Sequence, residues 1–403
     1  MSFPTSDDVW PFARDSAQPL LPPPRFAELR DEGLVEVKMY DGAPAVLATK
    51  YADIRDILMS DAVSSDGTLP NFPYVSDATR ANRGERRTFD RLDPPIHDEH
   101  RAMLASNFTQ KRIRELRPFV EEVVSNLLDE MEKANGSADF VTMFAQPIPA
   151  QIICRLLGLP LTDAPFFFDR IHIWTNDQGN PDDIVKATAE LLEYFDQLID
   201  ERIGAEGSDI ITGLVNKQLV PGHISRPQLL LTFHLLLIAG FDTTTNMIGL
   251  GTLLLLRNPD AWRELVETED PELVPSAVEE LLRFLSVAHS THIRLARGPI
   301  PVGHQLIPAG AGILAPQGAG NHDPAQFPDP DTLDIHRDAR GHLAFGAGVH
   351  QCLGQQLARL ELNVVFSLLP KRFPDLQLDV PFDELPFRPN SMVYGVESMP
   401  VRW

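Results

Sequence analysis

Cysteine is scarce in this 403-residue chain, which has only Cys154 and Cys352. Two thiols cannot build the disulfide framework on which small secreted domains depend. Basic residues are also in the minority, with 35 Lys and Arg against 57 Asp and Glu, so the formal net charge is −22. Because phosphate binding needs a basic footprint, this balance argues against nucleic acid as a partner.

The sequence also lacks a targeting segment. Its first 24 residues, MSFPTSDDVWPFARDSAQPLLPPP, contain no basic start followed by an apolar run, so we expect neither a signal peptide nor a membrane anchor. Internal repeats and low-complexity runs are missing too. The remaining composition, 43% hydrophobic and 23% charged, is that of an ordinary globular protein. By default this predicts a cytoplasmic protein with no membrane partner.

The spacing of apolar residues predicts a mainly α-helical protein with a smaller β-rich region. Residues 97–257 carry apolar side chains three and four positions apart, which is typical of helices. Residues 34–49 alternate around the turn pair Asp41–Gly42 and predict a β-hairpin. Residues 287–316 are rich in β-branched residues, Pro and Gly and predict short strands.

Two segments read as irregular. The Pro-rich residues 1–24 give no periodic signal, and residues 65–92 are polar and loop-like. A loop of that length inside a compact chain is usually functional. No linker divides the sequence, so we expect one domain over residues 1–403.

The longest apolar stretch spans residues 227–259, PQLLLTFHLLLIAGFDTTTNMIGLGTLLLLRNP. As a helix it would be ~50 Å long at ~1.5 Å per residue. A membrane span is one interpretation, but Asp242 near the middle would cost ~2.5–3.5 kcal/mol on insertion. We therefore expect a buried core helix.

The middle of this stretch, AGFDTTT, carries chemistry of its own. Ala239 and Gly240 leave room on one face, and Asp242 and Thr243 follow Ala239 by three and four residues, so both lie near that face. The Thr243 hydroxyl can bond to the carbonyl four residues earlier and loosen the helix. An acid beside a hydroxyl suits proton delivery into a cavity. From these residues alone, a pair that merely satisfies a helix kink is an equal alternative.

The stretch FGAGVHQCLG, residues 345–354, places Cys352 on a backbone with little side-chain bulk. A Cys–His nucleophile is poorly served by His350 two residues away, and a structural zinc site needs about four ligands. Thiolate ligation of a haem iron needs one cysteine and bare backbone around it, which Gly346, Gly348 and Gly354 supply. A helix start just after the thiol would stabilise a thiolate. A structural turn around a buried cysteine is the simpler alternative, and we read Cys154, among apolar residues, in that way.

Five motifs in the same order resemble those of the cytochrome P450 family. They are DPPIHDEHR (93–101), AGFDTT (239–244), EELLR (279–283), HDPAQFPDPDTLDIHR (322–337) and FGAGVHQCLG (345–354). The resemblance covers residues from about 10 to 403 and is closest to soluble actinobacterial members. It implies the family's single triangular-prism-like domain, its long central I helix and a haem b cofactor, iron protoporphyrin IX.

The resemblance also implies roles for individual residues. Cys352 matches the thiolate ligand of the haem iron, and Phe345 matches the residue that packs beside the sulfur. Asp242 and Thr243 match the acid–alcohol pair that delivers protons, which decides between the two interpretations given above. Residues matching those that hold the haem propionates are His97, Arg101, Arg294 and His350. Further haem contacts implied by the motifs are Ala239, Gly240, Thr243, Gly346 and Gly354.

A structural role for the pair Glu280 and Arg283 is implied only by the resemblance. By residue type alone, an acid and a base three positions apart on a helix predict a surface ion pair. The family motif instead implies that Glu280, Arg283 and Arg337 form a buried structural network behind the haem loop.

The activity implied is that of a monooxygenase, which uses dioxygen to hydroxylate, epoxidise or dealkylate a mostly apolar small molecule. Only about 50 residues follow Cys352, so we expect no flavin or iron–sulfur domain in the chain. Electrons from NAD(P)H would then arrive through a ferredoxin reductase and a ferredoxin, with the protein a monomer. A basic patch of Arg101, Lys111, Arg112 and Arg114 is the candidate docking face, or else only a solvated helix face.

The substrate pocket is expected to be apolar. Its candidate residues are Phe72, Val75, Leu235, Ala239, Val287, Ala288 and Met392. The nearest rival function is a P450-type nitric oxide reductase that takes hydride from NAD(P)H directly, because the N-terminal third also resembles those fungal enzymes. Their acid–alcohol pair is typically missing, whereas AGFDTT is present here. A peroxide-driven oxygenase and a non-catalytic haem sensor, which would need no proton relay, are two more rival functions.

Overall fold

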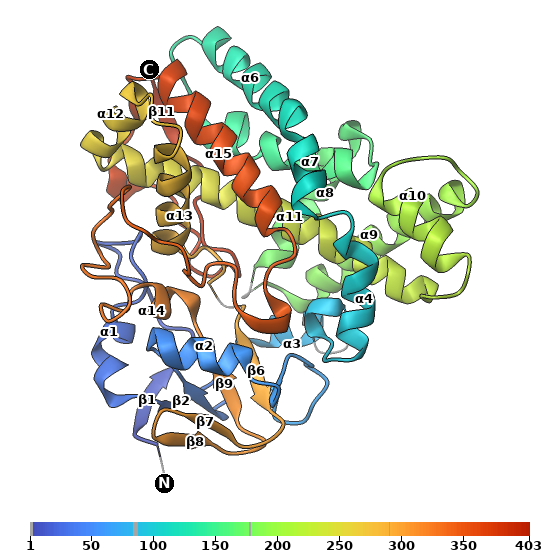
Figure 1. Ribbon diagram of the computed structural model, residues 1–403, viewed down its shortest axis with the longest axis vertical. Helices are drawn as coiled ribbons and strands as arrows, with labels where there is room; N and C mark the ends of the chain where they lie inside the picture. Colours follow the sequence, from blue (N-terminus) through green and yellow to red (C-terminus); the bar gives the residue numbers. More distant parts are fainter. Residues whose placement is uncertain (1–2, 84–87, 177–178, 290) are drawn as a thin grey trace.

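The structure, a computed structural model, describes residues 3–83, 88–176, 179–289 and 291–403. Helices make up most of the molecule, and the largest sheet lies at the end of it near the N-terminus, whereas strand β11 (Pro400–Arg402) lies at the other end (Figure 1). The C-terminus lies at the opposite, helical end. The predicted architecture, mainly α-helical with a small β-rich region, is confirmed. The expectation of a single domain stays a prediction.

Helices α1 to α10 lie before residue 220. They are α1 (Arg25–Leu29), α2 (Tyr51–Met59), α3 (Asp77–Arg83), α4 (Ile96–Ala105), α5 (Gln110–Glu115), α6 (Arg117–Lys133), α7 (Pro147–Leu157), α8 (Ala164–Thr175), α9 (Pro181–Arg202) and α10 (Ile210–Leu214). The later helices include the central one. They are α11 (Arg226–Leu256), α12 (Pro259–Glu267), α13 (Leu273–Leu285), α14 (Gln317–Asn321) and α15 (Gln355–Arg372).

The strands form three small sheets. The largest has the order β1-β2-β3-β9-β6-β4, the second β10-β11-β5, and the third pairs β7 with β8. Their bounds are β1 (Thr5–Val9), β2 (Val35–Lys38), β3 (Pro44–Leu47), β4 (Val63–Ser64), β5 (Ser137–Asp139), β6 (Ile293–Ala296), β7 (Ile300–Val302), β8 (Gln305–Ile307), β9 (Gly312–Leu314), β10 (Gln377–Leu378) and β11 (Pro400–Arg402). The predicted hairpin is β2 and β3, which pair antiparallel around Gly42.

Two segments expected to be irregular contain regular structure. Strand β1 pairs in parallel with β2, so the first 24 residues are not wholly irregular. Residues 65–92 include helix α3, which packs against α9. Both elements are stabilised by partners far away in sequence, which a local pattern does not reveal. Residues 84–87 of that predicted loop lie outside the described part of the chain.

Helix α11 runs through the middle of the molecule (Figure 1), packed against α7, α9, α13 and α15. It begins with a capping box, in which the side chains of Ser225 and Gln228 satisfy each other's backbone amides, and has Pro227 in its first turn. Because it is apolar on nearly every side, it is covered on nearly every side. In the described ranges, none of the helices is long and apolar enough to cross a membrane.

Candidate active site

The loop of residues 345–354 closes on itself just before α15. The Cys352 N–H donates to the Phe345 carbonyl at 2.8 Å. Gly346 and Gly348 both have φ +71°, in the left-handed region that favours glycine. A side chain on Gly346 would come within 2.9 Å of His292 Nε2, and one on Gly348 would overlap the Leu58 carbonyl. Two of the three glycines are thus required by backbone shape and by close packing.

Gly354 is different from the other two glycines. It has φ −82° as the N-cap of α15, and no atom lies within 4 Å of the position that a Cβ would take. Backbone conformation therefore does not require glycine at this position, and Gly354 contributes only the bare backbone expected beside Cys352. Because Gly354 has no side chain, the start of α15 is open on the side that faces the cavity.

The Cys352 thiol sits at the N-terminal end of α15 and lines a cavity of about 350 Å³. Burial raises the pKa of this thiol, while the amide of Gly354 and the guanidinium of Arg101 act in the opposite direction. Because the pKa is raised on balance, a metal ion that bound the sulfur would have to displace the thiol proton. Cys154, in contrast, is buried within α7, where burial raises its pKa to about 11.

The same cavity gathers most of the residues singled out from the sequence. Helix α11 supplies one wall, the cysteine loop another, and a third is made of Val287, Ala288, Thr291, His292, Arg294, Met392 and Val393. The predicted residues that line it are Arg101, Leu235, Ala239, Gly240, Thr243, Val287, Ala288, Arg294, Phe345, His350, Cys352, Gly354 and Met392. These predicted residues come from five separate parts of the chain and meet in one cavity.

Phe72 and Val75 are not among the described residues that line this cavity. Both are buried in a second hydrophobic core, formed around the largest sheet. Phe72 instead lines a larger cavity of about 780 Å³ beside β3 and β9, which contains no thiol or helix α11 residue and so is not the candidate site. Residues 69–75 pack onto the largest sheet, so Phe72 lies outside the cavity beside Cys352. The centre of its ring is 5.9 Å from the Arg91 guanidinium.

Three other predicted residues lie next to the cavity rather than on its surface. The His97 ring is 4.5 Å from that of His350, which does line it. Gly346 packs on His292, a lining residue. Asp242 is buried in α11 and pairs with Arg388.

Helix α11 carries the expected side-chain hydrogen bond beside the cavity. Thr243 Oγ1 donates to the Ala239 carbonyl at 2.8 Å, as its position four residues later predicts. Asp242 Oδ1 accepts from Arg388 Nη1 at 3.1 Å and from Asn246 Nδ2 at 3.0 Å. Its other oxygen, Oδ2, is buried without a hydrogen-bond partner among the described residues. The acid is therefore fixed on one side only.

A basic cluster forms another side of the cavity. Burial lowers the pKa of His350 to about 2, helped by the nearby charges of Arg294, His97, Arg91 and Arg101. Burial and the Arg91 charge also lower the pKa of Arg294, to about 10. His97 Nε2 and His350 Nδ1 are buried without a hydrogen-bond partner within the described ranges. Such a concentration of buried cations and orphaned nitrogens calls for an anion with several oxygens.

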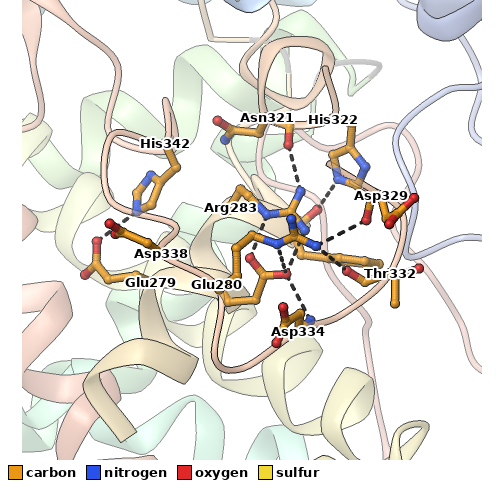
Figure 2. A network of polar contacts seen from close by, with 12 residues as sticks. Glu279, Glu280, Arg283, Asn321, His322, Asp329, Thr332, Asp334, Asp338 and His342 are labelled. Atoms are coloured by element: carbon orange, nitrogen blue, oxygen red, sulfur yellow. Dashed lines mark hydrogen bonds and ion pairs between the residues drawn. The ribbon is translucent and has the colours of Figure 1, made fainter. Parts of the chain in front are cut away.

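An ion-pair network with a fully buried centre connects α13 to residues 321–337 (Figure 2). Arg283 donates from Nε and Nη2 to the Glu280 carboxylate at 2.7 and 2.8 Å, and from Nη1 to the Asn321 carbonyl at 2.7 Å. Arg337 Nε donates to Glu280 Oε1 at 3.2 Å. Glu280 and Arg283 are both 0% exposed. The surface pair predicted from residue types alone is wrong, and the arrangement implied by the family motif is the one present.

Residues 161–391 match the model of the cytochrome P450 family. The chain is also 43% identical over 405 residues to the vitamin D3 dihydroxylase of Streptomyces griseolus, covering 99% of this chain and 98% of that one. It belongs to the cytochrome P450 family. A Fusarium lichenicola relative, cytochrome P450 55A3, is 37% identical over 400 residues, covering 98% of this chain and 96% of the relative.

The fold agrees with solved P450 structures. The mycinamicin VIII C21 methyl hydroxylase of Micromonospora griseorubida, solved with mycinamicin VIII, superposes with a TM-score of 0.92 at 37% identity, over 98% of this chain and 100% of that one. This P450 is accordingly a monooxygenase of small organic molecules that uses dioxygen, and its cofactor is haem b. When bound, the haem supplies the activation of dioxygen.

The residues present fit such a cofactor. The basic cluster offers cations and orphaned nitrogens where the two haem propionates would be held, by His97, Arg101, Arg294 and His350. Cys352, which lines the same cavity, would supply a thiolate ligand to the haem iron. No group of three or more His, Cys, Asp or Glu side chains that could hold a metal occurs in the described part of the chain.

Several site residues were missed from the sequence. Arg91 joins the basic cluster, but in the sequence nothing distinguishes it from Arg86 and Arg87 nearby. Arg388 holds Asp242 from 146 residues away, and no motif marks it. His292 also lines the cavity, directly before β6 and two residues before Arg294, and no motif marks it.

Proposed function

We propose that this P450 hydroxylates a mostly apolar organic molecule in the cavity beside Cys352, with the Cys352 thiolate as the axial ligand of the haem iron. One observation carries the proposal: a single cavity joins the thiol, the buried basic cluster and an apolar wall. A thiolate ligand donates electron density to the iron and favours O–O cleavage. The amide of Gly354 and the Arg101 charge support the thiolate form.

The overall reaction consumes dioxygen, two electrons and two protons for each substrate C–H bond oxidised. One oxygen atom enters the substrate as a hydroxyl group, and the other leaves as water. Both protons must reach a buried site, which bulk water does not freely enter. We propose that Thr243, whose hydroxyl lines the cavity, and Asp242, next to it in α11, hold and pass them.

The cavity wall indicates the class of substrate. The apolar residues of that wall are Leu235, Leu236, Ile238, Ala239, Val287, Ala288 and Met392. Trp174 and His234 add an indole and an imidazole, with their rings 5.6 Å apart. We propose a bulky, mainly hydrocarbon molecule with a polar substituent, in keeping with the vitamin D3 and mycinamicin VIII named for two relatives.

We further propose that electrons arrive from a ferredoxin, reduced by its reductase at the expense of NAD(P)H. Lys111, Arg112 and Arg114 are exposed on α5, which packs against α15, the helix that begins after Cys352. Arg101 Nη2 donates to the Gln351 carbonyl, so this basic face continues onto the cysteine loop itself. Steering by such a patch would raise the association rate of an acidic partner. That the protein works as a monomer stays a prediction.

The deciding experiment is turnover with a surrogate ferredoxin and ferredoxin reductase under ¹⁸O₂. Vitamin D3 and mycinamicin VIII are the first probes, preceded by a search for ligands that shift the Soret band. We expect one ¹⁸O atom in the product. Anaerobic oxidation of NADH by nitric oxide without partner proteins, and no ¹⁸O incorporation with any tight ligand, would favour the reductase alternative instead.

The docking face needs its own test. Lys111→Glu combined with Arg114→Glu should lower the second-order rate of reduction by ferredoxin about tenfold at low salt, and the loss should shrink as salt screens the patch. Lys38→Glu, at an exposed lysine of the sheet, is the control with the same kind of charge change. Equal losses from both changes would show that only net charge matters and would contradict docking at α5.

A further inference from the structure

Arg388 lies in the C-terminal segment 387–396, and its guanidinium connects two helices that border the cavity. Nη1 donates to Asp242 Oδ1 of α11 at 3.1 Å. Nη2 donates to Thr175 Oγ1, on the last residue of α8, at 3.1 Å. The Arg388 side chain is only 9% exposed, and the outward-facing Nε is 3.4 Å from Glu397 Oε1.

We propose that Arg388 is a positioning residue that couples the placement of α8 over the substrate cavity to the orientation of Asp242. Only the catalytic consequence of this proposal rests on the role in proton delivery proposed above for Asp242. The coupling itself is a property of the contacts and is measured without turnover.

The α8 side of the connection is fixed by several bonds to the same segment. The Thr175 carbonyl accepts from the Met392 N–H at 2.9 Å and from Ser391 Oγ at 3.2 Å. Arg388 Nη2 also donates to Ser391 Oγ at 3.0 Å. Trp174, one residue before Thr175, lines the cavity. Any movement of α8 that admits a substrate past Trp174 therefore pulls on the atoms that hold Arg388.

The Asp242 side is equally close-packed. Asn246 Nδ2 donates both to Asp242 Oδ1, at 3.0 Å, and to the Asp242 carbonyl, at 2.7 Å. Gly395 of the C-terminal segment packs directly on Asn246, so closely that any side chain there would overlap the Asn246 amide oxygen. Segment 387–396 thus lies against α11 on one side and against the end of α8 on the other.

The guanidinium makes the coupling specific. Its donors are held in one rigid plane, so it cannot follow Thr175 outward while keeping the same geometry to Asp242. With α8 in place, Oδ1 of Asp242 is fixed and Oδ2 alone is left for a water or a proton. With α8 displaced, that orientation is lost. Substrate entry and readiness to deliver protons become linked through one side chain.

The test is amide hydrogen exchange of the holoenzyme, measured on peptides that cover the end of α8. Thr175→Val removes the hydroxyl and should speed this exchange about tenfold. Asp242→Ala, on a different helix, should speed it several-fold as well. In an Arg388→Gln background, whose own exchange is already fast, Asp242→Ala should add nothing. If Asp242→Ala has the same effect in both backgrounds, or none in either, the coupling is overturned.

Two further measurements distinguish a loss of this coupling from a general loss of structure. Glu397→Gln removes the charge that faces Nε and, at 4.0 Å, His172 of α8, but it keeps both inner contacts of Arg388, so exchange at α8 should stay within about twofold of the parent. The rate at which 4-phenylimidazole shifts the Soret band should rise in every variant with fast α8 exchange and in no other. A faster rate in Glu397→Gln, or an unchanged rate in Thr175→Val, would contradict the proposal, whatever the outcome of the turnover experiments.

Discussion

The guanidinium of Arg359 lies 4.6 Å from the centre of the Phe345 ring, over the residue whose carbonyl accepts the Cys352 N–H. Arg359 is in turn held by Glu279, at 2.6 and 3.0 Å. Although burial opposes ionisation of Glu279, His342 and Arg359 hold its pKa at about 2. An ionised carboxylate on α13 thus positions a cation on α15 against the cysteine loop, and the loop is supported by charge as well as by packing.

The identity of the axial ligand can be tested at Cys352. Replacement by Ala removes the only thiol among the described residues that line the cavity. We expect the red-shifted Soret band of the reduced CO complex, which depends on thiolate ligation, to disappear even where haem is retained by the basic cluster. Cys154→Ala in α7 is the matched control and should leave that band in place. A surviving band in the Cys352 variant would contradict the assignment.

Thr243 is predicted to control coupling between electron use and product formation. Thr243→Ala removes the hydroxyl on the cavity surface and should raise the peroxide released per NAD(P)H several-fold, with correspondingly less hydroxylated product. Thr245→Ala is the matched control, because Thr245 makes the same bond to the carbonyl four residues earlier, at 3.0 Å, but is not among the described lining residues. If the Thr243 variant released no more peroxide per NAD(P)H than the parent, the proposed role of Thr243 in proton delivery would be contradicted.

The cysteine loop offers a comparison of two glycines. Gly346→Ala forces a side chain into the left-handed region, which costs about 1–2 kcal/mol, and against His292. We expect a lower urea midpoint and faster loss of haem. Gly354→Ala meets no protein atom at ordinary φ, so the urea midpoint of the haem-free protein should stay near that of the parent. Similar losses in the two variants would show that the loop tolerates no side chain anywhere.

The buried network gives a larger effect on stability. Glu280→Gln leaves Arg283 and Arg337 without their shared carboxylate, and removing one partner of a buried pair costs about 3–5 kcal/mol. Urea denaturation followed by haem absorbance measures the change. Asp338→Asn, in the exposed Arg340 pair, should leave the urea midpoint almost unchanged, because solvent screens such a pair. A comparably small loss for Glu280→Gln would mean that water enters the network.

How far the sequence predicts this site depends on how local each signal is. The cysteine loop and the centre of α11 are each encoded within ten residues, where glycine spacing and the Asp242–Thr243 pair carry the information. Arg388 and Arg91 act through contacts between distant segments, so their residue type alone does not mark them. The prediction for Phe72 is wrong for the same reason, since the path of residues 69–75 is decided by packing on the largest sheet.

Glu361 provides a prediction for pH dependence. Its carboxyl lines the cavity in α15, is 1% exposed, and has a pKa that burial raises well above the ordinary value. Because the folded state then keeps a proton that the unfolded chain releases, the free energy of unfolding falls as pH rises from about 4.5 towards the folded pKa, by about 1.4 kcal/mol per unit.

Glu361→Gln removes this dependence, since the amide cannot ionise. We expect the variant to match the parent near pH 4.5 and to become progressively more stable than the parent at higher pH, as measured by urea denaturation of the haem-free protein from pH 4.5 to 8. Glu32→Gln, at an exposed position, should reproduce the parent's profile. Parallel profiles for parent and Glu361→Gln would mean that the carboxyl is ionised in the fold, with a partner or a water that compensates its burial.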